Sequence, residues 1–233
     1  MADGNVSTKK WQFWIDRGGT FTDFVIRAPG GKLTTHKLLS ENPERYKDAA
    51  LQGIRETLGV DGDDPLPEGL VEAVKMGTTV ATNALLERKG ERTLLAVTTG
   101  FADQLRIGYQ NRPNIFARRI ELPELLYESV IEIDERMSAE GDVLTPLDET
   151  AARESLQAAF DDGIRSVAIV FMHGYRYHDH EAAVGAIARD IGFTQVSVSH
   201  EVSPLMKFVG RGDTTVVDAY VSPILRRYVD QVA

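Results

Sequence analysis

The residues best suited to chemistry lie near the start of the chain, in the run Asp-Arg-Gly-Gly-Thr-Phe-Thr-Asp at positions 16–23. The adjacent Gly18 and Gly19 allow a tight backbone turn, in which several N–H groups can point at one anion. The hydroxyls of Thr20 and Thr22 can add further donors. A carboxylate cannot face phosphate directly, but Asp16 can hold a hydrated Mg²⁺ that neutralises the phosphate. The run therefore predicts a phosphate-binding hairpin with a carboxylate on the metal side.

An ordinary hairpin turn is the alternative interpretation of the same residues. A Gly-Gly pair between two apolar runs is common in such turns, and a loop between two strands gains nothing from a helix dipole. Two features favour phosphate. Asp16 ends an apolar strand with only Arg17 as a basic neighbour, and the Thr-x-Thr-Asp that follows supplies hydroxyls that a plain turn does not need.

A second candidate group, Thr78, Thr79 and Asn83, falls at a predicted strand-to-helix junction. Backbone N–H groups and hydroxyls at such a junction can bind phosphate or a polarised carbonyl oxygen. On spacing alone, a threonine helix cap with an asparagine in the first turn is the better explanation of these residues.

Histidines gather after a predicted apolar strand, at positions 173, 178 and 180, with Glu181 beside them. Zinc uses such side chains, but their spacing matches no common ligand pattern. We therefore expect no metal at this cluster.

The order of predicted elements indicates an α/β protein. Residues 11–15, 22–26 and 32–37 read as three strands joined by tight glycine turns, which predicts an antiparallel meander. Alternating helices and strands follow. The first helix begins near residues 40–43 and ends at Gly59, and a strand is predicted at 71–76. A helix at 80–89, which Gly90 ends, is followed by a strand at 94–97 and a short helix at 101–107. This order is expected of a ribonuclease H-like unit, the half-domain of the actin fold.

A second α/β stretch follows residue 110. Strands are predicted at 130–133, 167–172 and 196–199, the middle one fully apolar and hence central. Helices are predicted from the cap Asp148 and over 181–191. Residues 214–232 read as a helix broken at Pro223.

Composition limits the possible partners. The 233 residues include 42% hydrophobic side chains, enough for a folded core, and the net charge of -9 argues against nucleic acid and an anionic membrane surface. The chain has no cysteine, and neither a signal peptide nor a membrane-spanning run is apparent. We expect a cytoplasmic protein with no nucleic-acid or membrane partner.

Two long motifs resemble the hydantoinase A/5-oxoprolinase family of the actin-like ATPase superfamily. The first is the glycine run with Ile15 before it, and the second is Met-Gly-Thr-Thr-Val-Ala-Thr-Asn-Ala-Leu-Leu-Glu-Arg-Lys-Gly at 76–90. Shorter segments at 38–41, 134–136, 172–175 and 218–220 are also similar. Arg17 and Met76, with the segment 211–213, resemble the long ATP-hydrolysing 5-oxoprolinases more than hydantoinase subunits.

The resemblance implies ATP and Mg²⁺ as cofactors and 5-oxo-L-proline as substrate, whose lactam is phosphorylated and opened to L-glutamate. Gly18, Gly19, Thr20 and Thr22 would hold phosphate and Asp16 would hold Mg²⁺. Catalytic roles would fall to Asp16, to Arg17 as a neutralising charge, and to three residues facing the site: Thr78, Thr79 and Asn83.

The resemblance also implies a domain order and partners. Residues 1–110 would form the ribonuclease H-like phosphate-binding unit, 111–202 a second α/β unit, and 203–233 the start of a following hydantoinase A domain. The remaining domains would be partners, in a homo-oligomer at full length, and the fragment alone would bind nucleotide weakly without turnover. Alternatives are a hydantoinase A or acetone carboxylase-type subunit, and a non-catalytic actin-like interaction domain.

Overall fold

The chain folds into two compact units, described separately here. The computed structural model describes residues 10–62, 64–110 and 114–232. One unit comprises the described residues up to Asn83 together with those from Leu225 onward, and the other comprises Ala84–Ile224. The boundaries therefore fall inside two helices, α2 (Val80–Leu86) and α7 (Phe208–Val232).

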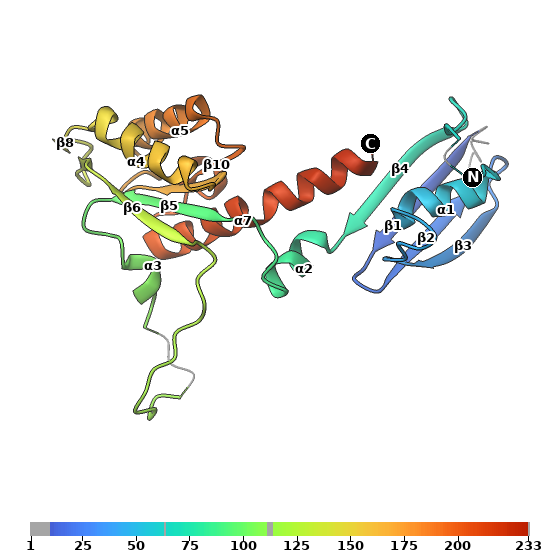
Figure 1. Ribbon diagram of the computed structural model, residues 1–233, viewed down its shortest axis with the longest axis horizontal. Helices are drawn as coiled ribbons and strands as arrows, with labels where there is room; N and C mark the ends of the chain where they lie inside the picture. Colours follow the sequence, from blue (N-terminus) through green and yellow to red (C-terminus); the bar gives the residue numbers. More distant parts are fainter. Residues whose placement is uncertain (1–9, 63, 111–113, 233) are drawn as a thin grey trace, which may run out of the picture. The chain divides into compact units, whose positions relative to one another are not determined.

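A four-stranded sheet forms the first unit (Figure 1). Its strands are β1 (Trp11–Arg17), β2 (Phe21–Arg27), β3 (Leu33–Leu39) and β4 (Val71–Thr78), in the order β3-β2-β1-β4. The first three form the expected antiparallel meander, and β4 runs parallel to β1. Helix α1 (Ala49–Leu58) packs on one face, over a core of six buried side chains: Phe13, Ile15, Phe24, Ile26, Ala50 and Ile54.

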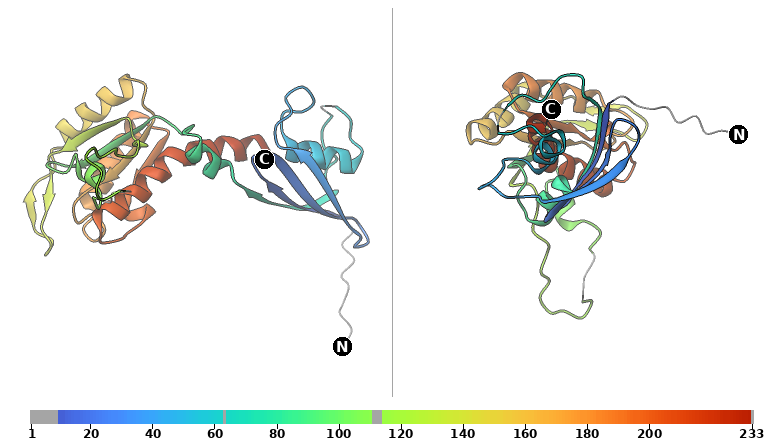
Figure 2. Two further views of the ribbon diagram at one scale, coloured as in Figure 1. Left: turned by 90° about the horizontal axis from the view of Figure 1, so that it is seen from below. Right: turned by 90° about the vertical axis from the view of Figure 1, so that its right-hand side faces the viewer.

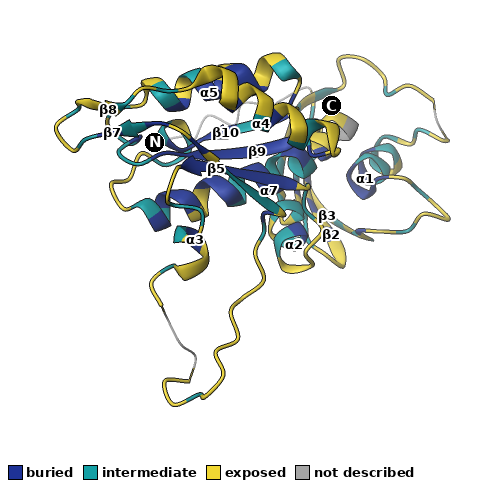
Figure 3. Ribbon diagram, turned by 60° about the vertical axis from the view of Figure 1, so that its left-hand side comes forward, coloured by how far each residue is buried: buried dark blue, intermediate teal, exposed yellow. Residues whose placement is uncertain are grey.

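An all-parallel sheet forms the second unit, with strands β5 (Thr93–Thr98), β6 (Ser129–Ile133), β9 (Ser166–Val170) and β10 (Gln195–Val198) in the order β10-β9-β5-β6. Both of its faces are covered. Leu94 and Ala96 pack toward α4 (Glu149–Asp161) and α5 (Asp179–Ile191), and the alternate Leu95 and Val97 pack toward α3 (Gln104–Ile107) and α7. This explains the continuous apolar runs of β5 and β9, which Figure 3 shows as buried.

The smaller elements are α6 (Ser199–Val202) and an antiparallel pair that the sequence did not indicate, β7 (Arg136–Met137) with β8 (Val143–Thr145). The segment between α3 and β6 contains no helix or strand among its described residues, which the right-hand view in Figure 2 shows as a loop. No described helix is long and apolar enough to cross a bilayer.

The mixed α/β architecture and the central position of β9 are confirmed, but β5 differs from expectation. Residues 84–110 were expected to belong with the first unit, whereas β5 pairs with β6 and β9 in the second sheet. A buried parallel strand has the same apolar pattern in either sheet, so its sequence does not reveal its partners. The assignment of 203–233 to a following domain stays a prediction.

Two helix boundaries also differ. The first helix begins after Asp48 rather than near residues 40–43, because the Asp48 carboxylate accepts the Leu51 N–H at 2.9 Å and thus provides the N-cap. Helix α2 ends at Leu86, before the expected stop at Gly90, and Arg88 adopts a left-handed φ of 56°.

Helix α7 continues through Pro223 instead of breaking there. Proline lacks the N–H that would bond the carbonyl four residues earlier, which is that of Ala219. The Ser166 hydroxyl of β9 donates to this carbonyl at 2.6 Å and satisfies it instead.

Candidate phosphate-binding site

The glycine run forms the turn between β1 and β2, and its tip presents free backbone donors. The Gly18 N–H donates to the Phe21 carbonyl at 3.0 Å and closes the turn. The N–H groups of Gly19 and Thr20 have no hydrogen-bond acceptor among the described residues, and both residues are exposed. Two free amides at one tight bend can bind an anion.

Ser40, at the end of β3, braces this turn from the core side. Its hydroxyl donates to the Gly18 carbonyl at 2.7 Å, so the Thr22 hydroxyl, 3.0 Å away, donates to Ser40 in turn. The Ser40 N–H also donates to the Thr20 carbonyl at 2.9 Å. These bonds direct two carbonyls of the turn toward Ser40. Thr22, expected to hold phosphate, is completely buried in this brace.

The brace was not recognised from the sequence. The sequence places Ser40 in a predicted helix entry and in the short 38–41 resemblance, and its contacts with Gly18 and Thr22 form only when β3 pairs with β2.

Asp16 lies on the face of the sheet that α1 does not cover. Neighbouring residues in a strand point to opposite faces, and Ile15 and Arg17 face α1. Asp16 is exposed and stands directly opposite Asp23 of β2, which also pairs with Lys37 at 2.8 Å. A second carboxylate therefore stands beside the predicted metal-side residue.

A hollow of about 410 Å³ lies at these two carboxylates. It is lined by Trp14, Ile15, Asp16, Asp23, Val25, Lys75, Met76 and Gly77. Gly77 pairs with Asp16 across β1 and β4, and a Cβ atom there would come 3.6 Å from Asp16 Oδ1. Exposed carboxylates beside an open hollow suit a hydrated Mg²⁺, which keeps several of its waters when bound.

The start of α2 adjoins the glycine turn. The Thr79 N–H and hydroxyl donate to the Arg17 carbonyl at 3.1 and 3.3 Å, while the Thr78 hydroxyl accepts the Val80 N–H at 3.2 Å. The amide nitrogen of Asn83 lies 3.1 Å from where a Gly19 Cβ would be. Both threonine side chains are thus hydrogen-bonded to nearby backbone groups, and the Asn83 side chain lies next to the turn.

Arg17 is engaged on the opposite face from Asp16. Its Nη1 lies 3.8 Å from Asp48 Oδ2, and its guanidinium lies 4.5 Å from the centre of the Tyr228 ring. The Tyr228 hydroxyl donates to Met76 Sδ at 3.1 Å. Burial, reinforced by the nearby Asp48 charge and opposed by Arg17, raises the pKa of Tyr228.

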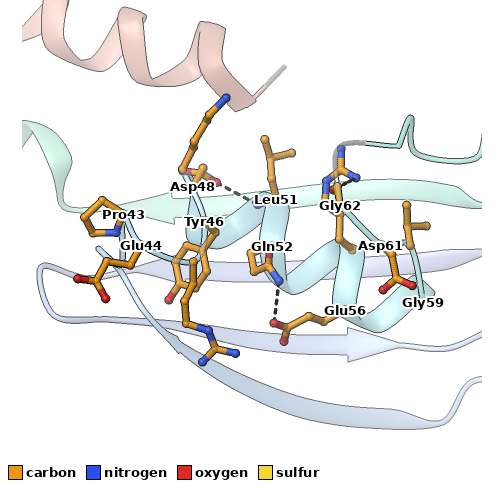
Figure 4. A pocket seen from close by; sticks show the side chains of 14 residues that line it. Pro43, Glu44, Tyr46, Asp48, Leu51, Gln52, Glu56, Gly59, Asp61 and Gly62 are labelled. Atoms are coloured by element: carbon orange, nitrogen blue, oxygen red, sulfur yellow. Dashed lines mark hydrogen bonds between the residues drawn. The ribbon is translucent and has the colours of Figure 1, made fainter.

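A separate polar pocket of about 730 Å³ runs along the outer side of α1 (Figure 4). Asp48 forms part of its wall, together with Gln52 and Glu56, whose side chains are hydrogen-bonded at 2.8 Å. None of its lining residues belongs to the glycine turn.

Two buried carboxylates of the second unit pair with histidines, and one of these, His180, belongs to the predicted cluster. His180 Nδ1 lies 2.8 Å from Glu135, and His200 Nδ1 lies 2.7 Å from Glu181. The described side chains contain no group of three or more that could hold a metal ion.

Arg211 is fully buried, and this burial lowers the pKa of its guanidinium. The same guanidinium donates to the Phe171 carbonyl at 2.5 Å.

The protein is thus a mixed α/β protein whose glycine turn, with two free amides, lies beside an exposed acidic pair. The chain belongs to the hydantoinase/oxoprolinase family, because residues 12–192 match the model of the hydantoinase/oxoprolinase N-terminal region.

Curated relatives and a solved structure agree with this family. The chain is 42% identical to 5-oxoprolinase of Dictyostelium discoideum over 95% of its length, and 41% identical to that of Saccharomyces cerevisiae over 100%. It spans 20% of each relative. The ATP-dependent caprolactamase from Pseudomonas jessenii superposes with a TM-score of 0.76 at 29% identity, covering 95% of this chain and 33% of that one.

Proposed function

We propose that this chain is the N-terminal, phosphate-binding part of an ATP-dependent 5-oxoprolinase with an actin-like ATPase module. The main support is the sequence identity of 41–42% to three curated 5-oxoprolinases across nearly the whole chain. A second support comes from the structure, in which the free Gly19 and Thr20 amides lie beside the exposed Asp16.

In this proposal the turn binds the phosphates of ATP. The Gly19 and Thr20 amides donate to phosphate oxygens, and the Thr20 hydroxyl can add a donor. Asp16, with Asp23 beside it, holds hydrated Mg²⁺, which supplies charge neutralisation when bound. Thr79 fixes the position of the turn relative to the start of α2, where Asn83 adjoins it, and Thr22 and Ser40 fix it relative to the core.

ATP makes lactam opening feasible because an amide is a poor electrophile. The lactam oxygen of 5-oxo-L-proline takes the terminal phosphoryl group, and ADP leaves. Water then adds to the activated carbon and the ring C–N bond breaks, which leaves glutamate with a phosphorylated side-chain carboxyl. A second water releases the phosphate and gives L-glutamate. Since phosphoryl transfer depends mainly on positioning and charge neutralisation, a rigid amide turn is a suitable contribution from this chain.

The proposal extends to the surroundings of the chain. It would act in the cytoplasm, joined to the remaining domains of a longer polypeptide that assembles into a homo-oligomer. The relatives' fivefold greater length supports the additional domains.

The test is an assay of the full-length gene product for glutamate and phosphate release from 5-oxoproline and ATP. Asp16→Asn is expected to lower turnover by at least about 100-fold, as loss of a metal-side carboxylate should. Glu154→Gln, an exposed change on α4, is the control and should leave the rate unchanged. Turnover of hydantoin but not 5-oxoproline would favour a hydantoinase-type subunit, and an Asp16→Asn enzyme of full activity would refute the site.

A non-catalytic interaction domain is the remaining alternative. Calorimetric titration of Mg·ATP into the chain and into its Gly19→Val variant separates the two. The valine side chain would meet Asn83, whose amide nitrogen already lies 3.1 Å from the Cβ position. Loss of binding in the variant supports the turn as the site, whereas equal heats would indicate a nucleotide bound elsewhere.

A further inference from the structure

The inference concerns Arg17 and rests on the nucleotide site proposed above. Asp16 and Arg17 are consecutive in β1, so their side chains leave opposite faces of the sheet. Asp16 is exposed beside the hollow, whereas the Arg17 side chain is 16% exposed and faces the side that α1 covers. The Asp16 carboxylate therefore faces the open hollow, whereas the Arg17 guanidinium lies against α1 on the other face of the sheet.

Two side chains, those of Asp48 and Tyr228, hold the Arg17 side chain. Asp48, which precedes α1, supplies a carboxylate 3.8 Å away that is itself only 8% exposed. Tyr228 of α7 places its ring against the guanidinium, and its hydroxyl donates to Met76 of β4. A guanidinium that stacks on a ring and faces a buried carboxylate is a planar anchor that lysine cannot reproduce.

The main chain of Arg17 is held as well. Its carbonyl accepts both the N–H and the hydroxyl of Thr79, and the next residue, Gly18, closes the turn. Movement of the Arg17 side chain therefore acts directly on the base of the phosphate-binding turn.

Turning Arg17 toward a bound phosphate would be costly. It would leave the nearly buried Asp48 carboxylate without its counter-ion, and a buried charge without a partner is strongly destabilising. It would also remove the cation from the Tyr228 ring. The contacts thus favour a side chain that stays in place.

We propose that Arg17 is a positioning residue, and that Asp48 and Tyr228 are its partners in one cluster that fixes the base of the phosphate-binding turn. In this role Arg17 does not neutralise the transferred phosphoryl group. Nucleotide affinity then depends on residues of α1 and α7 that do not touch the nucleotide.

The test is a set of double-mutant cycles on Mg·ATP binding, measured by calorimetry. The single variants are Arg17→Met, Asp48→Asn and Tyr228→Leu. Asparagine keeps the N-cap hydrogen bond to Leu51 while removing the charge, so its effect isolates the ion pair. Each single variant is expected to raise the Kd about 5- to 20-fold, and each pair is expected to raise it no further than its worse member.

Conservative changes provide the controls. Tyr228→Phe keeps the ring under Arg17 and should bind within about twofold of wild type. Asp230→Asn, an exposed change two residues further along α7, should have no effect. Arg17→Lys keeps the charge but loses the planar contact, so it should resemble Arg17→Met.

Direct phosphate contact by Arg17 would give a different result. Arg17→Met would then weaken binding, Arg17→Lys would largely restore it, and Asp48→Asn and Tyr228→Leu would have little effect. That outcome would overturn the positioning role.

A ligand-free measurement separates this inference from the nucleotide site. Amide hydrogen exchange at Gly18 and Thr79, the bonded amides at the base of the turn, should speed up at least fivefold in all three single variants. Unchanged exchange in these variants would refute the cluster, whether or not nucleotide binds. A wild-type chain with no affinity for Mg·ATP would count against the proposed function, and the exchange data would still decide the inference.

Discussion

Ser40 shows how a single hydroxyl can hold together a glycine turn from the core side. It is 4% exposed and lies behind the turn, where it satisfies one carbonyl and one hydroxyl of its neighbours. Thr22 was expected at the phosphate because its residue type and spacing suit a ligand. The structure gives that hydroxyl a partner in the core instead.

Ser40→Ala is therefore expected to destabilise the chain by about 1–3 kcal/mol, because it leaves the Gly18 carbonyl and the Thr22 hydroxyl without their partner. Urea unfolding followed by circular dichroism measures this. Thr35→Ala, an exposed position on β3 with no side-chain hydrogen bond among the described residues, is the control. The double variant Ser40→Ala/Thr22→Val should cost less than the sum of the single changes, and strict additivity would contradict the brace.

At the scale of elements, the close packing of α1 on the meander depends on a glycine. A Cβ atom at Gly53 would lie 2.3 Å from the Phe24 ring, too close for any real contact. Helix α1 can thus pack closely on the sheet because residue 53, which faces the Phe24 ring, has no side chain.

Gly53→Ala is expected to destabilise the chain by about 1–3 kcal/mol through overpacking, although alanine alone would favour the helix by about 1 kcal/mol. Chemical denaturation gives the value. Gln52→Ala, the adjacent position on the same helix, should stay within about 0.5 kcal/mol of wild type. In a Phe24→Leu background the alanine should cost less, and an equal cost in both backgrounds would show that the ring is not the obstacle.

Local patterns predicted the meander, the Asp148 cap of α4 and the apolar strand β9, because alternation, capping and burial are properties of neighbouring residues. Partner choice was not predictable in the same way. The apolar run of β5 suits either sheet, and the position of Ser40 depends on strand pairing. At the candidate site, Asp16 and the glycines were recognisable from type and spacing, while Asp23, Asp48 and Tyr228 became neighbours only through the fold.

At the scale of the whole molecule, the proposed function assigns phosphate binding to one glycine turn of this chain. Its other Gly-Gly pair, Gly30-Gly31, lies in the turn between β2 and β3, where the Gly31 N–H is already bonded to the Ala28 carbonyl. Both glycines have positive φ, 97° and 91°, as such a turn requires. The residues just before that turn, 24–29, include no carboxylate that could take the metal-side position of Asp16.

The chain alone is expected to bind Mg·ATP weakly, with a Kd of about 0.1 mM or higher, and to release no phosphate above background. An actin-like site would need a second phosphate-binding half and an adenine pocket in addition to this turn. A coupled assay for phosphate over several hours, with Asp16→Ala as the control, tests this. Steady turnover by the chain that Asp16→Ala abolishes would show that the chain contains a complete active site.

The hydroxyl of Ser166 has a consequence for how this family can vary. It replaces the backbone donor that Pro223 lacks, so a proline in α7 is tolerated because of a side chain 57 positions earlier. The two positions should therefore change together across related sequences, with proline at 223 accompanied by serine or threonine at 166. In this way, a proline within one helix and a hydroxyl on a distant strand would be retained or lost together.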